Sequence, residues 1–390
     1  MLWFWSILVF LVMFSVIVII HELGHFVTAR WSGVKVHEFG LGMGKRLFTL
    51  GQDKKGCIFT INLIPFGGFV SLEGEDMENI DDKPLNPEAF YSKPWWKRSM
   101  MILAGVTMNY LLALIILMIL FMRGTTPILL SQADVKQEIE KGTIVLGEGI
   151  PVIEVQKEGA AAQAGLQKND IVLRVNNQAV KTPKFISDLQ TMYSSLNYQI
   201  LRPQVKNPAE ITDLSKVKDF KSLNLVIKPN ADHKIGVAFS SYPMIKEIKT
   251  VQYSFKASFM ESNRISAQVA KSTVQALGSL VKRLLTKAEL PEGVAGPVGI
   301  AAMTHTIVQE GNFDGFWKFV ALISLSLAVI NVLPIPALDG GRFLFLLIEL
   351  ISPWPIKAKW QGVIHQIAYL LLLGLIFLVT SHDIYNLFVK

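Results

Sequence analysis

Residues 2–25 read LWFWSILVFLVMFSVIVIIHELGH, and this stretch decides the fold. It is an uncharged apolar run that ends in the motif His21-Glu22-Leu23-Gly24-His25. A helix places residues four apart on one face, so His21 and His25 can offer two imidazoles to one zinc ion. Glu22 lies beside them as the base for a water molecule on that metal. We therefore predict a hydrolytic zinc site at membrane depth, with Glu22 as its catalytic residue.

The alternative for this motif is a pair of satisfied histidines at the interfacial end of a helix. Ionisable residues in an apolar span are costly and usually serve a function. Three of them lie within the motif at the end of this span. Their cost favours metal binding over a purely structural role.

The composition places the chain among membrane proteins. Its 390 residues are 51% hydrophobic, with a mean hydropathy of +0.39. Four stretches approach the roughly 20 apolar residues that a bilayer requires; they are residues 2–26, 100–122, 316–337 and 364–380. The first has no basic segment before it and no small-residue cleavage site, so we expect a retained span rather than a removable signal peptide.

The distribution of basic residues in short loops predicts the orientation of the spans. No charged side chain precedes the first span. Lysines and arginines are frequent between the first two spans, namely Arg30, Lys35, Lys45, Arg46, Lys54, Lys55, Lys93, Lys97 and Arg98. We therefore place residues 27–98 in the cytoplasm and the amino terminus outside. The long region after the second span is then extracytoplasmic, and the third span returns to the cytoplasmic side.

The net charge of +7 is spread through the chain. It lacks the clustered basic stripe that nucleic-acid binding requires, so no nucleic-acid partner is expected. The basic loops instead favour contact with anionic membrane lipid. Cys57 is the only cysteine, which excludes an internal disulfide and a cysteine-based zinc site.

Between the first two spans the pattern becomes strand-like and punctuated by glycine. Residues 36–40, 46–50 and 57–63 each read as a short strand, and Gly51 and Gly56 bound a turn. We predict a membrane-associated β-hairpin or small sheet in this region.

The segment Pro65-Phe66-Gly67-Gly68-Phe69-Val70 follows these strands. Strand edges at membrane depth are tolerated where they line a protein cavity. An open edge beside the metal can bind an extended substrate as an additional strand. Gly67 and Gly68 are therefore predicted to bind substrate. The alternative is an ordinary cytoplasmic hairpin.

Residues 76–96 are acidic and contain proline, and they end in aromatic residues. This composition predicts a linker that runs into an interfacial aromatic belt. In the second span, Gly105 and Asn109 are four residues apart. Glycine allows another helix to approach closely, and asparagine in lipid requires a partner. Asn109 is predicted to bind substrate or to lend a hydrogen bond near the metal, although both residues can also be packing features.

The extracytoplasmic region contains one recognisable module. Residues 159–180, GAAAQAGLQKNDIVLRVNNQAV, resemble the core of a PDZ domain, with its short helix, Ala-Gly-Leu turn, Asp-Ile strand and asparagine-rich hairpin. Such domains bind peptides by strand addition, so an α+β PDZ domain with a peptide ligand is expected over residues 124–240. The alternative is a structural plug over the membrane core. Residues 241–312 read as an amphipathic helical connector. Three roles are open for it: a helix on the membrane surface, a gate beside the active site, or a connector that only packs against the rest of the protein.

A third zinc ligand is expected at the end of the third span, because a hydrolytic site needs three protein ligands and an open position. Residues 331–342 read NVLPIPALDGGR, and Asp339 is the only acidic residue between Asp314 and Glu349. In the predicted topology this end lies on the same side as the two histidines. The prolines suit a helix that unwinds beside a cavity, where Asn331 can hold a substrate backbone. The alternative for Asp339 is a carboxylate that caps a turn.

Taken together, these motifs resemble the site-2 protease family of intramembrane zinc metalloproteases, and its RseP-like branch in particular. The resemblance covers nearly the whole chain, through the histidine motif, residues 39–42, 65–68 and 104–109, the PDZ-like module and residues 331–340. It implies that His21, His25 and Asp339 bind Zn²⁺ and that Glu22 is the catalytic base. The protein after which the branch is named has two tandem PDZ domains, whereas only one is evident here.

The resemblance also implies the function and the location. Family members cleave single-pass membrane proteins within or near the spanning helix, such as an anti-sigma factor already trimmed by an outer protease, or signal-peptide remnants. We expect a polytopic α-helical protein of the bacterial inner membrane, with four transmembrane helices, a membrane-associated β region and an extracytoplasmic PDZ domain. The expected segments are the first helix (1–26), the β region and linker (27–98), the second helix (99–123), the PDZ domain (124–240), the connector (241–312), the third helix (313–340), and a cytoplasmic loop with the fourth helix (341–390).

Two other functions compete with proteolysis. A membrane zinc transporter is one, since histidines and carboxylates inside a membrane also line ion paths. The absence of a visible internal repeat in the sequence makes that a poor fit. The other is a non-catalytic PDZ scaffold with a decayed zinc site, against which the intact ligands and base argue.

Overall fold

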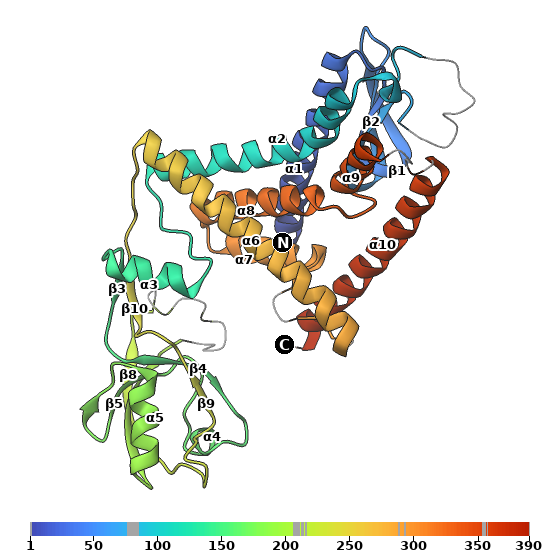
Figure 1. Cartoon of the computed structure of the whole chain (residues 1–390). Coiled ribbons are helices and arrows are strands. Elements are labelled where there is room, and N and C mark those ends of the chain that lie inside the picture. The colour runs from blue at the N-terminus through green and yellow to red at the C-terminus, as the bar shows by residue number, and fades with distance from the viewer. Residues whose placement is uncertain are drawn as a thin grey trace. The chain divides into compact units, whose positions relative to one another are not determined.

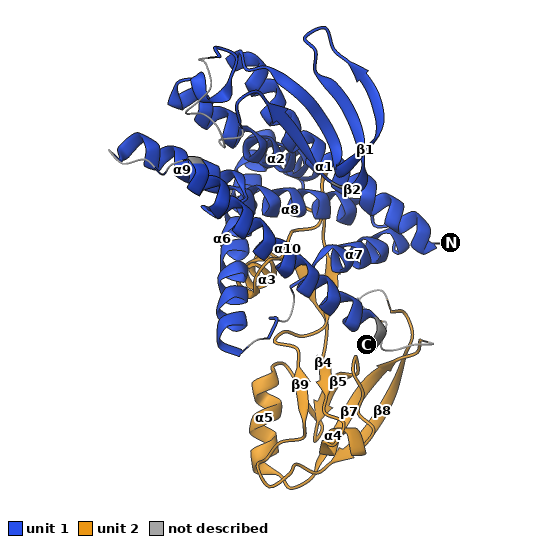
Figure 2. Cartoon of the chain, turned by 90° about the vertical axis from the view of Figure 1, so that its right-hand side faces the viewer, with its two compact units in different colours: residues 1–123, 252–390 blue, residues 124–251 orange. Residues whose placement is uncertain are grey.

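The computed structural model describes residues 2–75, 86–205, 211, 214, 217–287, 289–291, 294–352, 356 and 358–389. The chain divides into two compact units (Figure 2): unit 1 comprises residues 1–123 and 252–390, and unit 2 comprises residues 124–251. Part of the predicted acidic linker, residues 76–85, lies outside the described residues.

Four helices of unit 1 are long and apolar enough to cross a membrane. They are α1 (Leu2–Ser32), α2 (Trp95–Arg123), α8 (Phe313–Val332) and α10 (Ala358–Val389) (Figure 1). They confirm that the four predicted apolar stretches are helices of membrane-spanning length. The third is shorter at its carboxyl end than the predicted stretch, because Pro334 and Pro336 cannot continue a helix and the residue before a proline avoids the helical conformation.

The first two spans pack closely because glycine faces the contact. A Cβ atom added to Gly24 in α1 would lie 2.5 Å from the carbonyl oxygen of Ala104 in α2. Only hydrogen fits there. The core between the spans continues through Phe10, Met13 and Ile17 of α1, so the apolar side chains of α1 hold it against its neighbours before the histidine motif is reached.

Two strands follow α1, namely β1 (Val36–Gln52) and β2 (Ile58–Leu72). The predicted strands 36–40 and 46–50 join into β1, and the third continues as β2 through the Gly67-Gly68 segment. The prediction of separate strands was wrong because Gly42 and Gly44, with φ of 80° and 83°, let β1 bend without breaking.

The bend brings several segments of these strands side by side. Residues 38–41 of β1 pair with residues 68–71 of β2 and also with residues 58–61. The far half of β1 pairs with residues 58–62. Residues 68–72 therefore form an edge of the sheet, with no described strand on their other side.

Four further helical elements complete the described part of unit 1. They are the 3₁₀ turn at Phe90–Ser92, α6 (Phe255–Lys287), α7 (Pro297–Gln309) and α9 (Asp339–Ile351). Neither α7 nor α9 was predicted as a helix of its own. Their apolar residues are too few to form a span, and α9 gains its stability by packing against α2 and α8 (Figure 1).

Unit 2 is an α+β unit built around one sheet in the strand order β8-β7-β5-β4-β9, with β6 paired to β5. These strands are β4 (Ile150–Val155), β5 (Ile171–Val175), β6 (Gln178–Ala179), β7 (Leu196–Pro203), β8 (Phe220–Ile227) and β9 (Val237–Phe239). The helices are α3 (Gln132–Glu140), α4 (Ala160–Gln163) and α5 (Pro183–Met192).

The remaining strands of unit 2 form a separate pair, β3 (Ile144–Leu146) with β10 (Ile245–Ile248). Residues 245–248 carry a helix-like pattern in the sequence but are strand here. Pairing with β3 outweighs that local preference. The helical segment begins only at Phe255.

Candidate active site

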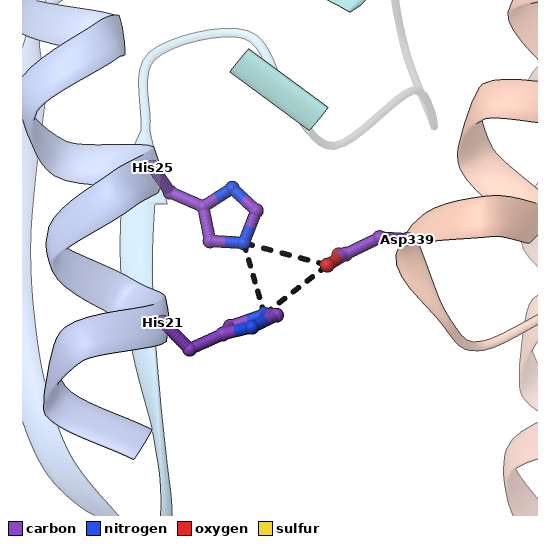
Figure 3. A group of neighbouring side chains, drawn as sticks. All are labelled: His21, His25 and Asp339. Atoms are coloured by element: carbon purple, nitrogen blue, oxygen red, sulfur yellow. Dashed lines mark hydrogen bonds and ion pairs between the residues drawn. The ribbon is translucent and has the colours of Figure 1, made fainter. Parts of the chain in front are cut away.

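Three side chains from two distant parts of the chain converge in unit 1. Helix α1 presents His21 and His25 on one face, and the first residue of α9 presents Asp339 (Figure 3). The Nε2 atoms of the two imidazoles are 3.1 Å apart. Asp339 Oδ2 lies 3.1 Å from His21 Nε2 and 3.5 Å from His25 Nε2. The three atoms form a nearly equilateral triangle.

This triangle fits zinc. Zinc bonds of about 2.0–2.1 Å at tetrahedral angles place ligand atoms about 3.3–3.4 Å from one another. Asp339 Oδ2 is buried and, despite its short distances to both rings, accepts no well-directed hydrogen bond from any described residue. Donor atoms that face a shared ion rather than each other have this arrangement. The residues present therefore suit a zinc ion with a fourth position left for water or substrate.

The chain between α8 and α9 turns back on itself to deliver Asp339. Ala337 has a φ of 77°, a conformation that is uncommon for a residue with a side chain. Its N–H donates to His365 Nδ1 of α10 at 2.8 Å. Cβ atoms at Gly340 and Gly341 would collide with the carbonyl oxygens of Leu333 and Ile335. The two glycines thus allow the proline-containing loop to fold over the start of α9.

Helix α2 lies behind the two imidazoles. The Nδ1 atom of His25 is 2.8 Å from the carbonyl oxygen of Met101, and that of His21 is 3.4 Å from the side-chain nitrogen of Asn109. Between them, a Cβ atom at Gly105 would lie 2.6 Å from His21 Nε2. The glycine in the second span therefore makes room for the two imidazole rings as well as for the helix.

A cavity of about 220 Å³ opens beside the three donor atoms. Glu22 lines it together with the sheet edge, through Gly68, Phe69, Val70 and Leu72. A Cβ atom at Gly68 would lie 3.0 Å from Glu22 Cγ, so the sheet edge directly adjoins the predicted base. The arrangement places a carboxylate, three side chains that could hold a metal ion and an open strand edge around one space.

The other predicted substrate-binding residues do not line this cavity. Gly67, with a φ of 81°, faces the side chain of Met43. Asn331 is half-buried near the end of α8. Asn109 is fully buried and lies against His21. The structure therefore brings Gly68 to the cavity and Asn109 to His21, whereas Gly67 and Asn331 are not among the residues that line the cavity.

Sequence reasoning missed two charged residues in the cavity wall. Arg342 of α9 and Glu75, which follows β2, both line the cavity and form an ion pair with each other. A second cavity of about 540 Å³ shares both residues and extends to α10. A basic residue directly after the Asp-Gly-Gly sequence was a usable signal for Arg342, whereas nothing local marked Glu75.

Comparison with known proteins agrees with this geometry. The sequence model of peptidase family M50 matches residues 9–375 of this chain. The zinc metalloprotease RasP of Oceanobacillus iheyensis is 27% identical over 98% of this chain and 99% of its own length. The regulator of sigma-W protease RasP of Bacillus subtilis is 26% identical over 98% and 99%. A Clostridium perfringens protein named as a candidate zinc metalloprotease is 30% identical over 96% and 97%.

Proposed function

Because the chain belongs to peptidase family M50, the site-2 zinc metalloproteases, we propose that it cleaves single-pass membrane proteins within or beside their spanning helices. The observation that carries this proposal is the cavity in which His21, His25 and Asp339 meet Glu22 and an open strand edge. The motif lies at the end of an apolar helix, so a substrate would be cut at or below the membrane surface.

We assign zinc binding to the three convergent donors and base catalysis to Glu22. Zinc, when bound, polarises the scissile carbonyl and acidifies a water molecule. The Glu22 carboxylate accepts a proton from the attacking water and delivers it to the amine nitrogen as the C–N bond breaks. One carboxylate thus acts first as base and then as acid, and its position in the cavity wall leaves it open to both partners.

The substrate would bind as an extended strand. A spanning helix satisfies its own backbone hydrogen bonds, so it must unwind before its peptide bonds become accessible. The unpaired edge at residues 68–72 offers replacement hydrogen bonds, as in other cases of strand addition. Gly68 keeps side-chain atoms away from Glu22 at this point. Gly67 and Asn331, which do not line the cavity, would contact substrate residues further from the scissile bond.

The substrate class follows from the chemistry and from one relative. A Bacillus subtilis protein named as a regulator of sigma-W protease is similar over almost the whole chain. We infer an anti-sigma factor or a signal-peptide remnant as the substrate, and the bacterial inner membrane as the location. The basic residues of the loop between α1 and α2 favour a cytoplasmic position for that loop and an extracytoplasmic one for unit 2.

Unit 2 would bind peptides as a PDZ domain does. Strand β9 is an edge of its sheet, and a groove of about 840 Å³ runs along it, lined by residues 236–239 and by Ser187 and Gln190 of α5. A peptide can add to this edge while its side chains contact α5. Titration of the full chain with labelled peptides that have free or amidated carboxyl termini tests this assignment. Saturable binding that is unaffected by Ser187→Trp, which fills the groove, would contradict it.

The variant Glu22→Gln tests the catalytic proposal. We expect it to retain zinc and to lose cleavage of a panel of single-span helices, because glutamine cannot accept the proton. Glu310→Gln, at the exposed end of α7, is the matched control and should cleave normally. Retained proteolysis in Glu22→Gln would end the proposal. Zinc flux into vesicles containing the purified protein would instead favour transport.

A further inference from the structure

Three residues of α2 follow one another at the spacing of a helix turn and face the histidines of α1. The Met101 carbonyl oxygen lies 2.8 Å from His25 Nδ1. Gly105 adjoins both rings. Asn109 then reaches His21, with its side-chain nitrogen 3.4 Å from Nδ1. Each metal-binding imidazole therefore has its own partner on α2, on the side away from Asp339.

The protonation of the rings follows from their direction. A neutral imidazole carries one N–H, and the other nitrogen binds the metal. Both Nε2 atoms point towards Asp339 Oδ2, so each Nδ1 carries the proton. His25 Nδ1–H donates to the Met101 carbonyl oxygen. His21 Nδ1–H needs an acceptor as well, and Asn109 is the side chain beside it.

Asn109 has an acceptor to offer. The residue is 0% exposed, and its side-chain oxygen is buried without a hydrogen-bond partner among the described residues. The oxygen and nitrogen of an amide have nearly the same shape, so the hydrogen-bond network decides which of them faces a neighbour. With the oxygen towards His21, the ring proton gains an acceptor. The backbone is already held there, because Ser324 Oγ of α8 donates to the Asn109 carbonyl oxygen at 2.8 Å.

We propose that Asn109 is a positioning residue that accepts a hydrogen bond from His21 Nδ1–H and so directs His21 Nε2 towards the zinc. The proposal rests on the assignment of His21 as a zinc ligand. It differs from a substrate-contacting role, since Asn109 has no exposed surface. Partners of this kind fix the orientation of a histidine ligand and raise its affinity for the metal.

The test compares zinc affinity in the purified full chain by competition with a chromophoric chelator. Asn109→Leu keeps the side-chain size but removes the acceptor, and we expect binding about 10- to 100-fold weaker. Asn109→Asp keeps an acceptor and cannot donate when ionised, so it should bind zinc within a few-fold of the unaltered chain. Thr107→Val on the same helix is the matched control, because the Thr107 hydroxyl donates to the carbonyl oxygen of Leu103 in its own helix.

Cobalt in place of zinc gives a second readout that does not depend on cleavage. The visible bands of Co²⁺ should shift in Asn109→Leu and stay near their original positions in Asn109→Asp, if the orientation of His21 depends on the acceptor. Unchanged affinity and spectrum in Asn109→Leu would overturn the proposal. So would an equal loss in both variants, which would mean that Asn109 donates instead.

Controls distinguish a loss of the positioning role from misfolding and from a failure of the proteolytic proposal. Circular dichroism and gel filtration of the metal-free variants report on the fold. If Asn109→Leu does not fold, the comparison of Asn109→Asp with Asn109→Ala decides, since alanine adds no new group. Zinc binding that depends on Asn109 in a chain that cleaves nothing would contradict the protease and leave the positioning role intact.

Discussion

The variant Gly105→Ala is the most direct test of the proposed zinc site, because it alters the space beside His21 and His25. The added methyl carbon would lie 2.6 Å from both Cε1 and Nε2 of His21, and it would also press on His25 Nε2. Favourable non-bonded contacts lie at about 3.5–4.0 Å, so one or both rings must move by about 1 Å. Zinc sites tolerate bond-length changes of only about 0.2 Å. The movement therefore has to be reversed, at a cost in energy, whenever zinc binds.

The size of the effect follows from the cost of overpacking. An extra methyl group in a filled site typically costs about 1–3 kcal/mol. At about 1.4 kcal/mol for each factor of ten, zinc affinity should fall about 5- to 140-fold. Chelator competition with the purified chain measures this directly. Peptide cleavage at limiting zinc should fall in parallel.

Gly278→Ala is the matched control for this variant. Gly278 lies in α6, and a Cβ atom there would have nothing within 4 Å. Alanine favours a helix over glycine by about 1 kcal/mol, so this variant should be as stable as the unaltered chain or slightly more so. If Gly105→Ala binds zinc as tightly as Gly278→Ala, zinc binding does not depend on the space that Gly105 leaves beside the two imidazole rings, and the reasoning is refuted.

Four further outcomes are expected. Gly68→Val should reduce cleavage at least tenfold without loss of zinc, since its side chain would enter the space next to Glu22; normal turnover in a steady-state assay would refute the proposed strand edge. Asp383→Ala should destabilise the chain by about 1–3 kcal/mol, because the Asp383 carboxylate accepts the N–H groups of Gly296 and Gly299 at the start of α7; an unchanged thermal midpoint would contradict this. Burial raises the pKa of Tyr198 to about 12, whereas the pKa of an unfolded tyrosine is about 10. The contribution of neutral Tyr198 to the free energy of unfolding is therefore complete below pH ~10 and is lost as the pH rises towards 12. Tyr198→Phe should reduce this loss of stability at high pH, as measured by denaturation curves. A zinc chelator should abolish cleavage, and added zinc should restore it; activity that survives dialysis against the chelator would exclude the assigned metal role.

The four spans and the convergence of the three donors followed from short-range rules. The charge-free runs predicted the helices, and helical spacing placed His21 and His25 on one face. The expected topology then brought Asp339 to the same side. The helices and the meeting of the three side chains are confirmed by the structure, whereas the orientation predicted from loop charge stays a prediction.

What the sequence did not predict depends on tertiary contacts. The carbonyl oxygen of Met101 contacts His25. Every residue has a backbone carbonyl group, so the identity of residue 101 could not predict this contact. Helix α9 is stabilised by packing rather than by length. The bends of β1 at Gly42 and Gly44 determine which segment becomes the sheet edge, and that choice depends on strands far apart in the sequence.

The order in which the three proposed metal ligands occur along the chain has a consequence for biosynthesis. His21 and His25 leave the ribosome before Asp339, which follows them by more than 300 residues. A nascent chain that has not yet reached α9 can offer only two of the three donors. Synthesis itself should therefore delay peptidase activity until the third span has been inserted, which protects neighbouring membrane proteins from a half-made enzyme.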